Sequence, residues 1–212
     1  MAWSCGSTSN TKGIDVSSNN GSSIESESWW RTLRNDDGVQ FGIIKATEGT
    51  TYTDPYVQSA WSACNAVNST TGSALYHYLD WNVSGTDQAN HFWNVVKALT
   101  NPTYSIDKSD LAVDIEGASS SSQFTVVEDF MTQMTSLLGG NMSDFLIYTN
   151  EITWKNLGNP TKYSYIALWL AAMNGQTWCP NYTFGGWGDW SFMQYGTATL
   201  DGVLCDLDEL NA

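Results

Sequence analysis

The sequence predicts a single α/β domain, an irregular TIM-like (β/α) barrel whose helices are reduced in the C-terminal part. Short apolar runs alternate with helical patterns along the whole chain, and these runs are continuously apolar rather than alternating. Continuous apolar runs are typical of strands buried on both faces, as in a parallel sheet. The length of 212 residues suits one barrel. A doubly wound open sheet would show the same alternation.

Seven apolar runs are expected to be strands, at residues 13–17, 41–47, 73–79, 110–116, 144–149, 165–172 and 190–195. Helical patterns lie between them, near residues 24–35, 55–68, 86–100, 122–138 and 150–157. Asp54 and Pro55 offer an N-cap followed by proline at the first helical position. The last quarter has little helical pattern and many Gly and Trp residues, so we expect its strands to join through loops.

No internal repeat or linker divides the chain. We therefore assign residues 1–11 to an N-terminal extension and residues 12–212 to the barrel. The extension, MAWSCGSTSN at its start, lacks the basic and apolar regions of a signal peptide. Export would use another route, or the sequence begins at a mature or cloned N-terminus.

Composition excludes several functions. The net charge of −14, from 22 acidic against 8 basic residues, would repel phosphate backbones, so no nucleic-acid partner is expected. The sequence contains no apolar run of about 18 residues, which excludes membrane insertion. The 11 Trp, 10 Tyr and 7 Phe residues exceed ordinary core needs, and flat rings of this kind often line sugar-binding clefts. Most of them are still expected to fill the core.

The four cysteines, Cys5, Cys64, Cys179 and Cys205, are far apart in the sequence. The absence of a C-x-x-C pair argues against a zinc or redox motif. One or two disulfides are compatible with an extracellular protein, and several pairings remain open.

Polar and aromatic residues lie at the C-terminal ends of the predicted strands. In an α/β barrel these ends open on one face, where active sites form. The residues concerned are Asp15, Glu48, Tyr76, His77, Tyr78, Asp114, Glu116, Tyr148, Trp169, Gln194 and Tyr195.

Asp114 and Glu116 are the most informative pair. Residues i and i+2 of a strand point to the same side, so both carboxyls would face the barrel mouth, with Ile115 turned into the packing. Two carboxyls this close should raise one pKa and leave a proton donor at working pH. Glycoside cleavage needs such an acid beside an anion. The alternative is a D-x-E sequence that forms a salt bridge or binds a cation.

His77 allows two interpretations, a general base or a hydrogen-bonded core residue. His91 has no acidic or cysteine neighbours in its helical pattern, so the sequence predicts no metal and no cofactor. A G-x-S-x-G elbow, a P-loop and a G-x-G-x-x-G fingerprint are all absent from the sequence.

Taken together, these segments resemble glycoside hydrolase family 25, the Chalaropsis-type lysozymes that include many phage endolysins. The resemblance extends in order from about residue 12 to the end. The matching stretches are GIDVSSNNG (13–21), FGIIKATEGTTYTDPY (41–56), ALYHYL (74–79), DQANHFWNVV (87–96), LAVDIE (111–116), LIYTN (146–150), LWLAA (168–172), WSFMQY (190–195) and DGVLCDLDELN (201–211).

The resemblance implies a lysozyme that cuts the β-1,4 bond between N-acetylmuramic acid and N-acetylglucosamine in peptidoglycan. Glu116 would be the catalytic acid, Asp114 its partner, and Asp15 and Asp206 further acidic residues of the site. Tyr76, His77, Tyr78, Glu48, Tyr148, Trp169, Gln194 and Tyr195 would contact the glycan. The family's mechanism looks similar to that of hexosaminidases whose substrate acetamido group attacks the anomeric carbon, with Asp114 orienting the amide. An inverting mechanism is the alternative.

The resemblance also implies a monomer that acts outside the producing cell or is released to the bacterial wall, with peptidoglycan strands as its partner. Two other functions remain open. A chitinase-like N-acetylhexosaminide hydrolase would share the chemistry, and a catalytically silent sugar-binding barrel would share the fold. Filled acidic positions disfavour the silent barrel, and the reducing ends released from peptidoglycan would separate the two enzymes.

Overall fold

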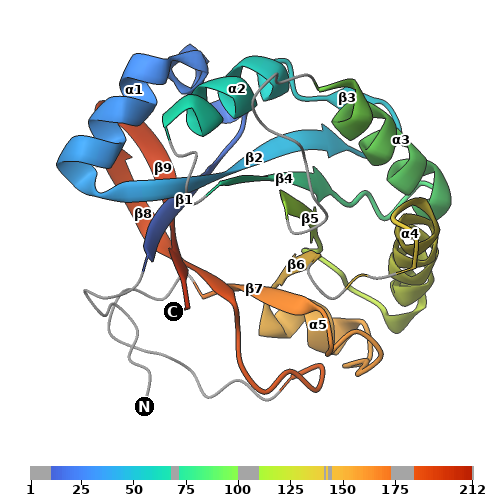
Figure 1. The fold of residues 1–212 in the computed structure, drawn as a ribbon. Helices are drawn as coiled ribbons and strands as arrows, with labels where there is room; N and C mark the ends of the chain where they lie inside the picture. Colours follow the sequence, from blue (N-terminus) through green and yellow to red (C-terminus); the bar gives the residue numbers. More distant parts are fainter. Residues whose placement is uncertain are drawn as a thin grey trace.

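Eight strands form a closed barrel in a computed structural model that describes residues 11–67, 72–99, 110–140, 142, 145–172 and 184–211 (Figure 1). The strands are β1 (Thr11–Val16), β2 (Val39–Glu48), β4 (Ser73–Tyr78), β5 (Leu111–Asp114), β6 (Leu146–Thr149), β7 (Ala167–Ala171), β8 (Phe192–Leu200) and β9 (Val203–Leu210). Their order around the barrel is β1-β9-β8-β7-β6-β5-β4-β2, and the pairing of β1 with β2 closes it. A short strand, β3 (Tyr52–Thr53), extends the end of β2.

Helices lie on the outside of the barrel and cover part of it, as Figure 1 shows. The longer ones are α2 (Val57–Val67), α3 (Gly85–Ala98) and α4 (Phe124–Leu137), and the shorter ones are α1 (Glu27–Thr32) and α5 (Glu151–Asn156). The single-turn segments are η1 (Ser18–Asn20), η2 (Ser22–Glu25), η3 (Leu33–Asp37) and η5 (Ser121–Gln123). Gly85 allows α3 to pack closely on α4, because a Cβ atom there would lie 2.1 Å from the Val126 carbonyl oxygen. None of the described helices is both long and apolar enough to cross a membrane.

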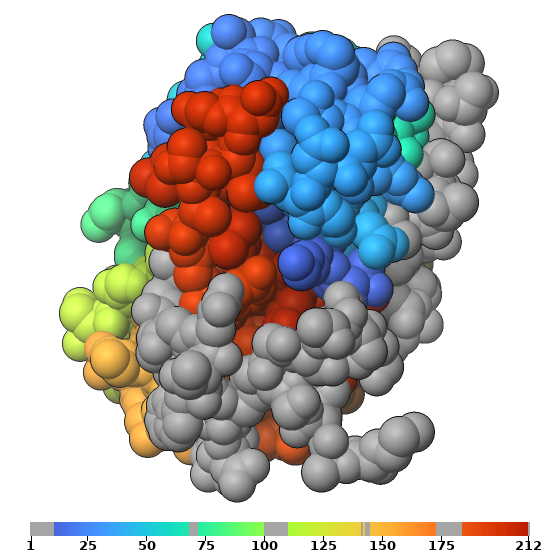
Figure 2. Space-filling model, turned by 90° about the vertical axis from the view of Figure 1, so that its left-hand side faces the viewer, coloured from blue at the N-terminus to red at the C-terminus, as the bar shows by residue number. Residues whose placement is uncertain are grey.

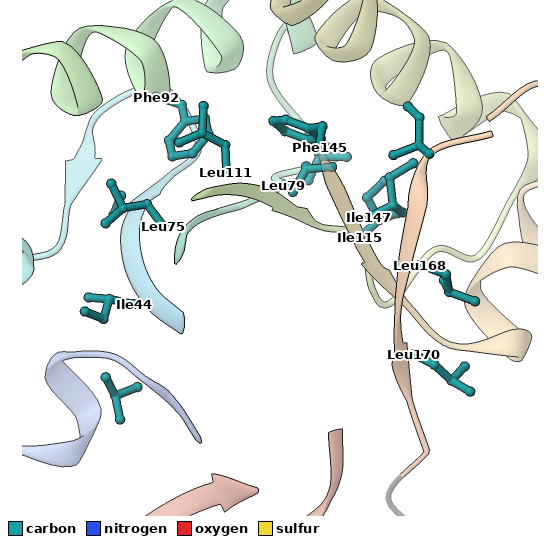
Figure 3. Packing of buried hydrophobic residues seen from close by; sticks show 14 of the residues in the cluster. Ile44, Leu75, Leu79, Phe92, Leu111, Ile115, Phe145, Ile147, Leu168 and Leu170 are labelled. Atoms are coloured by element: carbon teal, nitrogen blue, oxygen red, sulfur yellow. The ribbon is translucent and has the colours of Figure 1, made fainter. Parts of the chain in front are cut away.

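Alternation along each strand divides the buried residues into two clusters. One side of each strand packs against the helices, where Ile44, Leu75, Ile147 and Leu168 belong to the large outer cluster (Figure 3). The other side fills the barrel with a smaller cluster of mostly bulky residues. It consists of Phe41, Ile43, Ala74, Tyr76, Ala112, Leu146, Tyr148 and Trp169. The side chains that fill the barrel therefore include two tyrosines and a tryptophan.

The structure confirms the predicted barrel and shows a strand at each of the seven apolar runs. The predicted helices are also present, although the first one is divided into η2, α1 and the π-helical turn η3. The sequence did not predict β9. This strand is antiparallel to both of its neighbours, β1 and β8, and follows β8 through a tight turn at Asp201 and Gly202. Both turn residues have positive φ, 43° and 80°, which suits a two-residue hairpin.

The β8–β9 hairpin (red) lies beside the N-terminal segments (blue) on the face that Figure 2 shows. In this arrangement β9 lies between β1 and β8. Cys205 on β9 and Cys64 on α2 are both buried and are not joined by a disulfide, while Cys5 and Cys179 lie outside the described residues. The expected boundary at residue 12 falls one residue after the start of β1.

Candidate active site

A pocket of about 410 Å³ opens at the barrel mouth, where the parallel strands end. Its lining combines carboxyl groups, aromatic side chains and a single lysine. The lining residues are Asp15, Ser17, Asn19, Asn20, Lys45, Tyr76, Tyr78, Asp114, Glu116, Tyr148, Trp169, Gln194, Leu204 and Asp206. All four acidic residues expected in the site are therefore brought together, although they come from β1, β9 and the end of β5.

The end of β5 presents Asp114 and Glu116 to this pocket. Ile115 between them is fully buried in the outer cluster, and its N–H donates to the Tyr148 carbonyl oxygen of β6 at 2.9 Å. The carbonyl oxygen of Glu116 accepts from the Trp81 indole at 2.9 Å. Neighbouring elements thus fix the backbone on both sides, so the two carboxyls share one face as the i, i+2 spacing predicts.

Both carboxyls of this pair have raised pKa values. Burial is the largest cause for each, and for Asp114 the charges of Glu116 and Asp15 add to it. The pKa of Asp114 lies well above its ordinary value. A hydrogen bond from Tyr78 and the charge of Lys45 offset part of the rise in the pKa of Glu116. We expected one raised pKa, and the structure raises both, because the pair lies where the barrel excludes water.

Asp15, at the end of β1, is held by a hydrogen-bonded chain across the barrel. Gln194 Nε2 donates to Asp15 Oδ2 at 2.7 Å, and the Tyr148 hydroxyl donates to Gln194 Oε1 at 2.8 Å. Burial, followed by the charge of Asp206, raises the pKa of Asp15 to about 7. Asp206 is opposite Asp15 in the β1–β9 pairing, and burial raises the pKa of Asp206 as well.

Lys45 is a pocket residue that the sequence interpretation missed. Its ammonium group donates to Glu48 Oε2 at 2.6 Å and lies 4.8 Å from the centre of the Tyr78 ring. The same charge lowers the pKa of Asp114 and of Glu116, although less than burial raises them. Strand parity could have identified it, because Lys45 follows Phe41 and Ile43 at every second position on the inward face of β2.

Three expected glycan contacts are not among the residues that line the pocket. The assignment of His77 is corrected: alternation turns its side chain away from Tyr76 and Tyr78 to the helix-facing side of β4. There it is fully buried, with Nδ1 2.8 Å from Thr47 Oγ1, Nε2 3.1 Å from Gln88 Oε1, and its ring stacked on Phe130. Burial lowers the pKa of His77 to about 3, so the ring is neutral and structural.

Glu48 and Tyr195 lie beside the site rather than in it. Glu48 binds Lys45 from a position whose side chain is 44% exposed. Tyr195 follows Gln194 on β8 and packs against the outer cluster, because adjacent strand residues point to opposite faces. The other expected contacts, Tyr76, Tyr78, Tyr148, Trp169 and Gln194, line the pocket.

Turns at the rim supply the remaining lining residues. The Asn20 side chain accepts from the Ser17 N–H at 2.7 Å and donates to the Leu204 carbonyl oxygen at 2.7 Å, so it joins the end of β1 to the β8–β9 hairpin. Leu204 is 64% exposed. Asp208, two residues beyond Asp206, was also missed. It is fully buried behind the pocket and accepts from the Trp169 indole at 2.7 Å.

The pocket at the barrel mouth has aromatic walls and a pair of carboxyls with raised pKa values. This arrangement is typical of a glycoside hydrolase. Comparison with known proteins agrees. The sequence pattern described as glycosyl hydrolases family 25 matches residues 14–202. Lysozyme M1 of Streptomyces globisporus is 27% identical over 215 residues, which are 95% of this chain and 67% of that protein.

Two solved structures resemble the barrel over nearly its whole length. A family 25 lysozyme from Aspergillus fumigatus superposes with a TM-score of 0.73 at 25% identity, covering 96% of this chain and 95% of that one. A bacterial lysozyme from Streptomyces coelicolor gives 0.68 at 26% identity, covering 97% and 94%. The chain belongs to glycosyl hydrolase family 25. It is a lysozyme, a glycoside hydrolase that degrades peptidoglycan.

Proposed function

We propose that this lysozyme cleaves the β-1,4 bond between N-acetylmuramic acid and N-acetylglucosamine with Glu116 as the acid and Asp114 as the residue that orients the substrate's acetamido group. One observation carries this assignment. Asp114 Oδ1 is buried and has no hydrogen-bond donor among the described residues, although its carboxyl borders the same pocket as Glu116. A buried oxygen of this kind fits an N–H group brought by the ligand.

Glu116 has the properties of the acid. Its raised pKa keeps a proton on the carboxyl at higher pH than usual, and the Tyr78 hydroxyl binds it. That proton passes to the glycosidic oxygen as the bond from this oxygen to the anomeric carbon breaks. In the second step water attacks the anomeric carbon and displaces the acetamido oxygen bound there, and the Glu116 carboxylate takes a proton from this water, which restores the acid for the next cycle.

Asp114 supports the reaction through the acetamido group. The sugar's carbonyl oxygen attacks the anomeric carbon from the face opposite the leaving group, and positive charge spreads onto the amide. Asp114 accepts the amide N–H and stabilises this charge. Burial raises the pKa of Asp114 in the free protein, and the donated N–H favours its ionised form once substrate is bound.

Aromatic side chains form the remaining walls. The ring centres of Tyr148 and Trp169 are 4.6 Å apart, and those of Tyr76 and Trp169 are 6.1 Å apart, both in edge-on arrangements. These contacts fix the rings before any sugar binds, so little conformational entropy is lost on binding. Asp15 and Asp206 complete the negative potential that favours a positively charged transition state.

Digestion of purified peptidoglycan tests the bond assignment. We expect new reducing ends on N-acetylmuramic acid, identified by borohydride reduction and mass spectrometry, and no release of soluble products from chitin. Reducing ends on N-acetylglucosamine alone, or comparable turnover of chitin, would reject the proposal. The matched control is Glu116→Gln, which should bind glycan but release no ends.

The site of action and the state of assembly are part of the same proposal. We propose that the enzyme acts as a monomer on wall polymers outside the cell that makes it or after release to the bacterial wall. Light scattering during size exclusion should give a mass near 23.4 kDa, and a stable dimer would contradict this part.

A further inference from the structure

Behind the pocket, three neighbouring strands bring two buried carboxyls together. In the order β1-β9-β8, Asp208 of β9 is opposite Gln194 of β8, and Asp206 is opposite Asp15 of β1. The Gln194 amide crosses β9 to reach Asp15 at 2.7 Å. Asp208 lies diagonally across from Asp15 on the same inward face, near enough for each carboxyl to shift the pKa of the other.

The two oxygens of Asp208 have different surroundings. Oδ1 accepts from the Trp169 indole N–H at 2.7 Å, whereas Oδ2 is buried without a hydrogen-bond partner among the described residues. Asp15 offers only acceptor oxygens when it is ionised, and one of them is already bound by Gln194. A hydrogen bond between two carboxyls requires a proton on one of them.

We propose that Asp208 is a positioning residue that carries this proton on Oδ2 and donates it to Asp15, so that Asp15 can ionise inside the barrel. Trp169 selects the oxygen, because the N–H donated to Oδ1 leaves Oδ2 as the site of the proton. The indole also lines the pocket, so one side chain contacts the glycan site and orients Asp208. The activity test of this proposal rests on the proposed function, in which Asp15 acts as an anion.

The groups around the pair are consistent with this position of the proton. Burial and the charge of Asp15 raise the pKa of Asp208 well above its ordinary value, and the hydrogen bond from Gln194 lowers that of Asp15. The other facing carboxyls are Asp206 of β9 and the Asp114–Glu116 pair at the end of β5, and the charges of Asp206 and Glu116 raise the pKa of Asp15.

Four further titratable groups near the pair are neutral, and two of them, Tyr76 and Tyr148, lie on the inward face with it. Burial raises the pKa of Cys205 on β9 to about 12. It also raises the pKa values of three tyrosine hydroxyls, Tyr76 on β4, Tyr148 on β6 and Tyr195 on β8. These neighbours of the pair are thus carboxyls and neutral groups. A second hydrogen-bond donor to Asp15, beside Gln194, would stabilise its ionised form among them.

Two variants of Asp208 separate proton donation from shape. Asp208→Asn keeps an oxygen for Trp169 and an N–H for Asp15, so kcat/KM should stay within about threefold and the acidic limb of its pH profile within about half a unit of wild type. Asp208→Leu keeps the volume and removes the donor, so that limb should move up by about one unit or more. Equal shifts in both variants would overturn the proposal.

A second measurement needs neither activity nor the leucine variant. With ¹³C-labelled aspartate carboxyls, the wild-type NMR spectrum near neutral pH should contain a protonated-carboxyl signal that Asp208→Asn lacks. Identical protonated signals would overturn the proposal even if the enzyme cleaves peptidoglycan. A protein that shows the Asp208 signal but leaves peptidoglycan intact would instead reject the proposed function.

Discussion

Asp15 should make the folded protein less stable as the pH rises, and its replacement should reverse this. Its pKa is raised from 3.8 to about 7 in the folded state. Between these two values the folded chain keeps a proton that the unfolded chain has lost, so the free energy of unfolding falls through this window and the full cost is present above it. A difference of about 3 units corresponds to about 4 kcal/mol, against a typical total of about 5–15 kcal/mol.

The variant Asp15→Asn removes the titration and keeps an oxygen for the Gln194 amide. We expect it to match wild type in stability near pH 4 and to exceed it by up to about 4 kcal/mol near pH 8. Urea unfolding followed by tryptophan fluorescence across this range measures the difference. Asp201→Asn, at the exposed tip of the hairpin, is the control for a simple change of net charge. A difference between Asp15→Asn and wild type that stays constant with pH would refute the reasoning.

Four further predictions concern the reaction. Glu116→Gln should lose ~10²–10⁴-fold in the rate of wall lysis with an unchanged melting temperature, and a rate above about a tenth of wild type would remove Glu116 from the acid role. Asp114→Asn should lower kcat by ~10²-fold or more with little change in binding, and NMR of early wild-type products should show the β-anomer; the α-anomer first would favour a base that activates water. Lys45→Met removes a charge that lowers the pKa of Glu116, so the alkaline limb of the pH profile should move up by as much as about one unit, unlike in the exposed control Lys155→Met. Exhaustive chelation should leave lysis unchanged, and recovery of a lost activity by one divalent ion would show that the carboxyls are ligands.

The sequence was sufficient for the parallel part of the barrel. Runs such as residues 41–47 and 110–116 are apolar because both faces of a parallel strand are buried, and this signal is local. The β8–β9 hairpin has no such signal. Most residues of the second half of β8 and of β9 are only partly buried, and β9 carries Asp206 and Asp208 on its inward side. The sequence of β9 therefore resembles that of a polar loop until its pairing with β1 is known.

The site was predictable wherever strand parity decides it. Asp114 and Glu116 share a face because they are two residues apart, and the same rule would have separated His77 from Tyr76 and Tyr78. Lys45 was missed because a single lysine within an apolar run is easily interpreted as a residue near the end of the strand, with its side chain in solvent. The Asn20 contact with the hairpin depends on residues far apart in the chain, which no local pattern reports.

The insertion of β9 between β1 and β8 has a consequence for biosynthesis. A chain emerging from the ribosome can pair β1 through β8 in succession, yet the gap in the barrel wall persists until the last strand arrives. That strand also brings Asp206 into the pocket. Synthesis must therefore reach β9 before the barrel can close and before the pocket contains all four of its acidic residues.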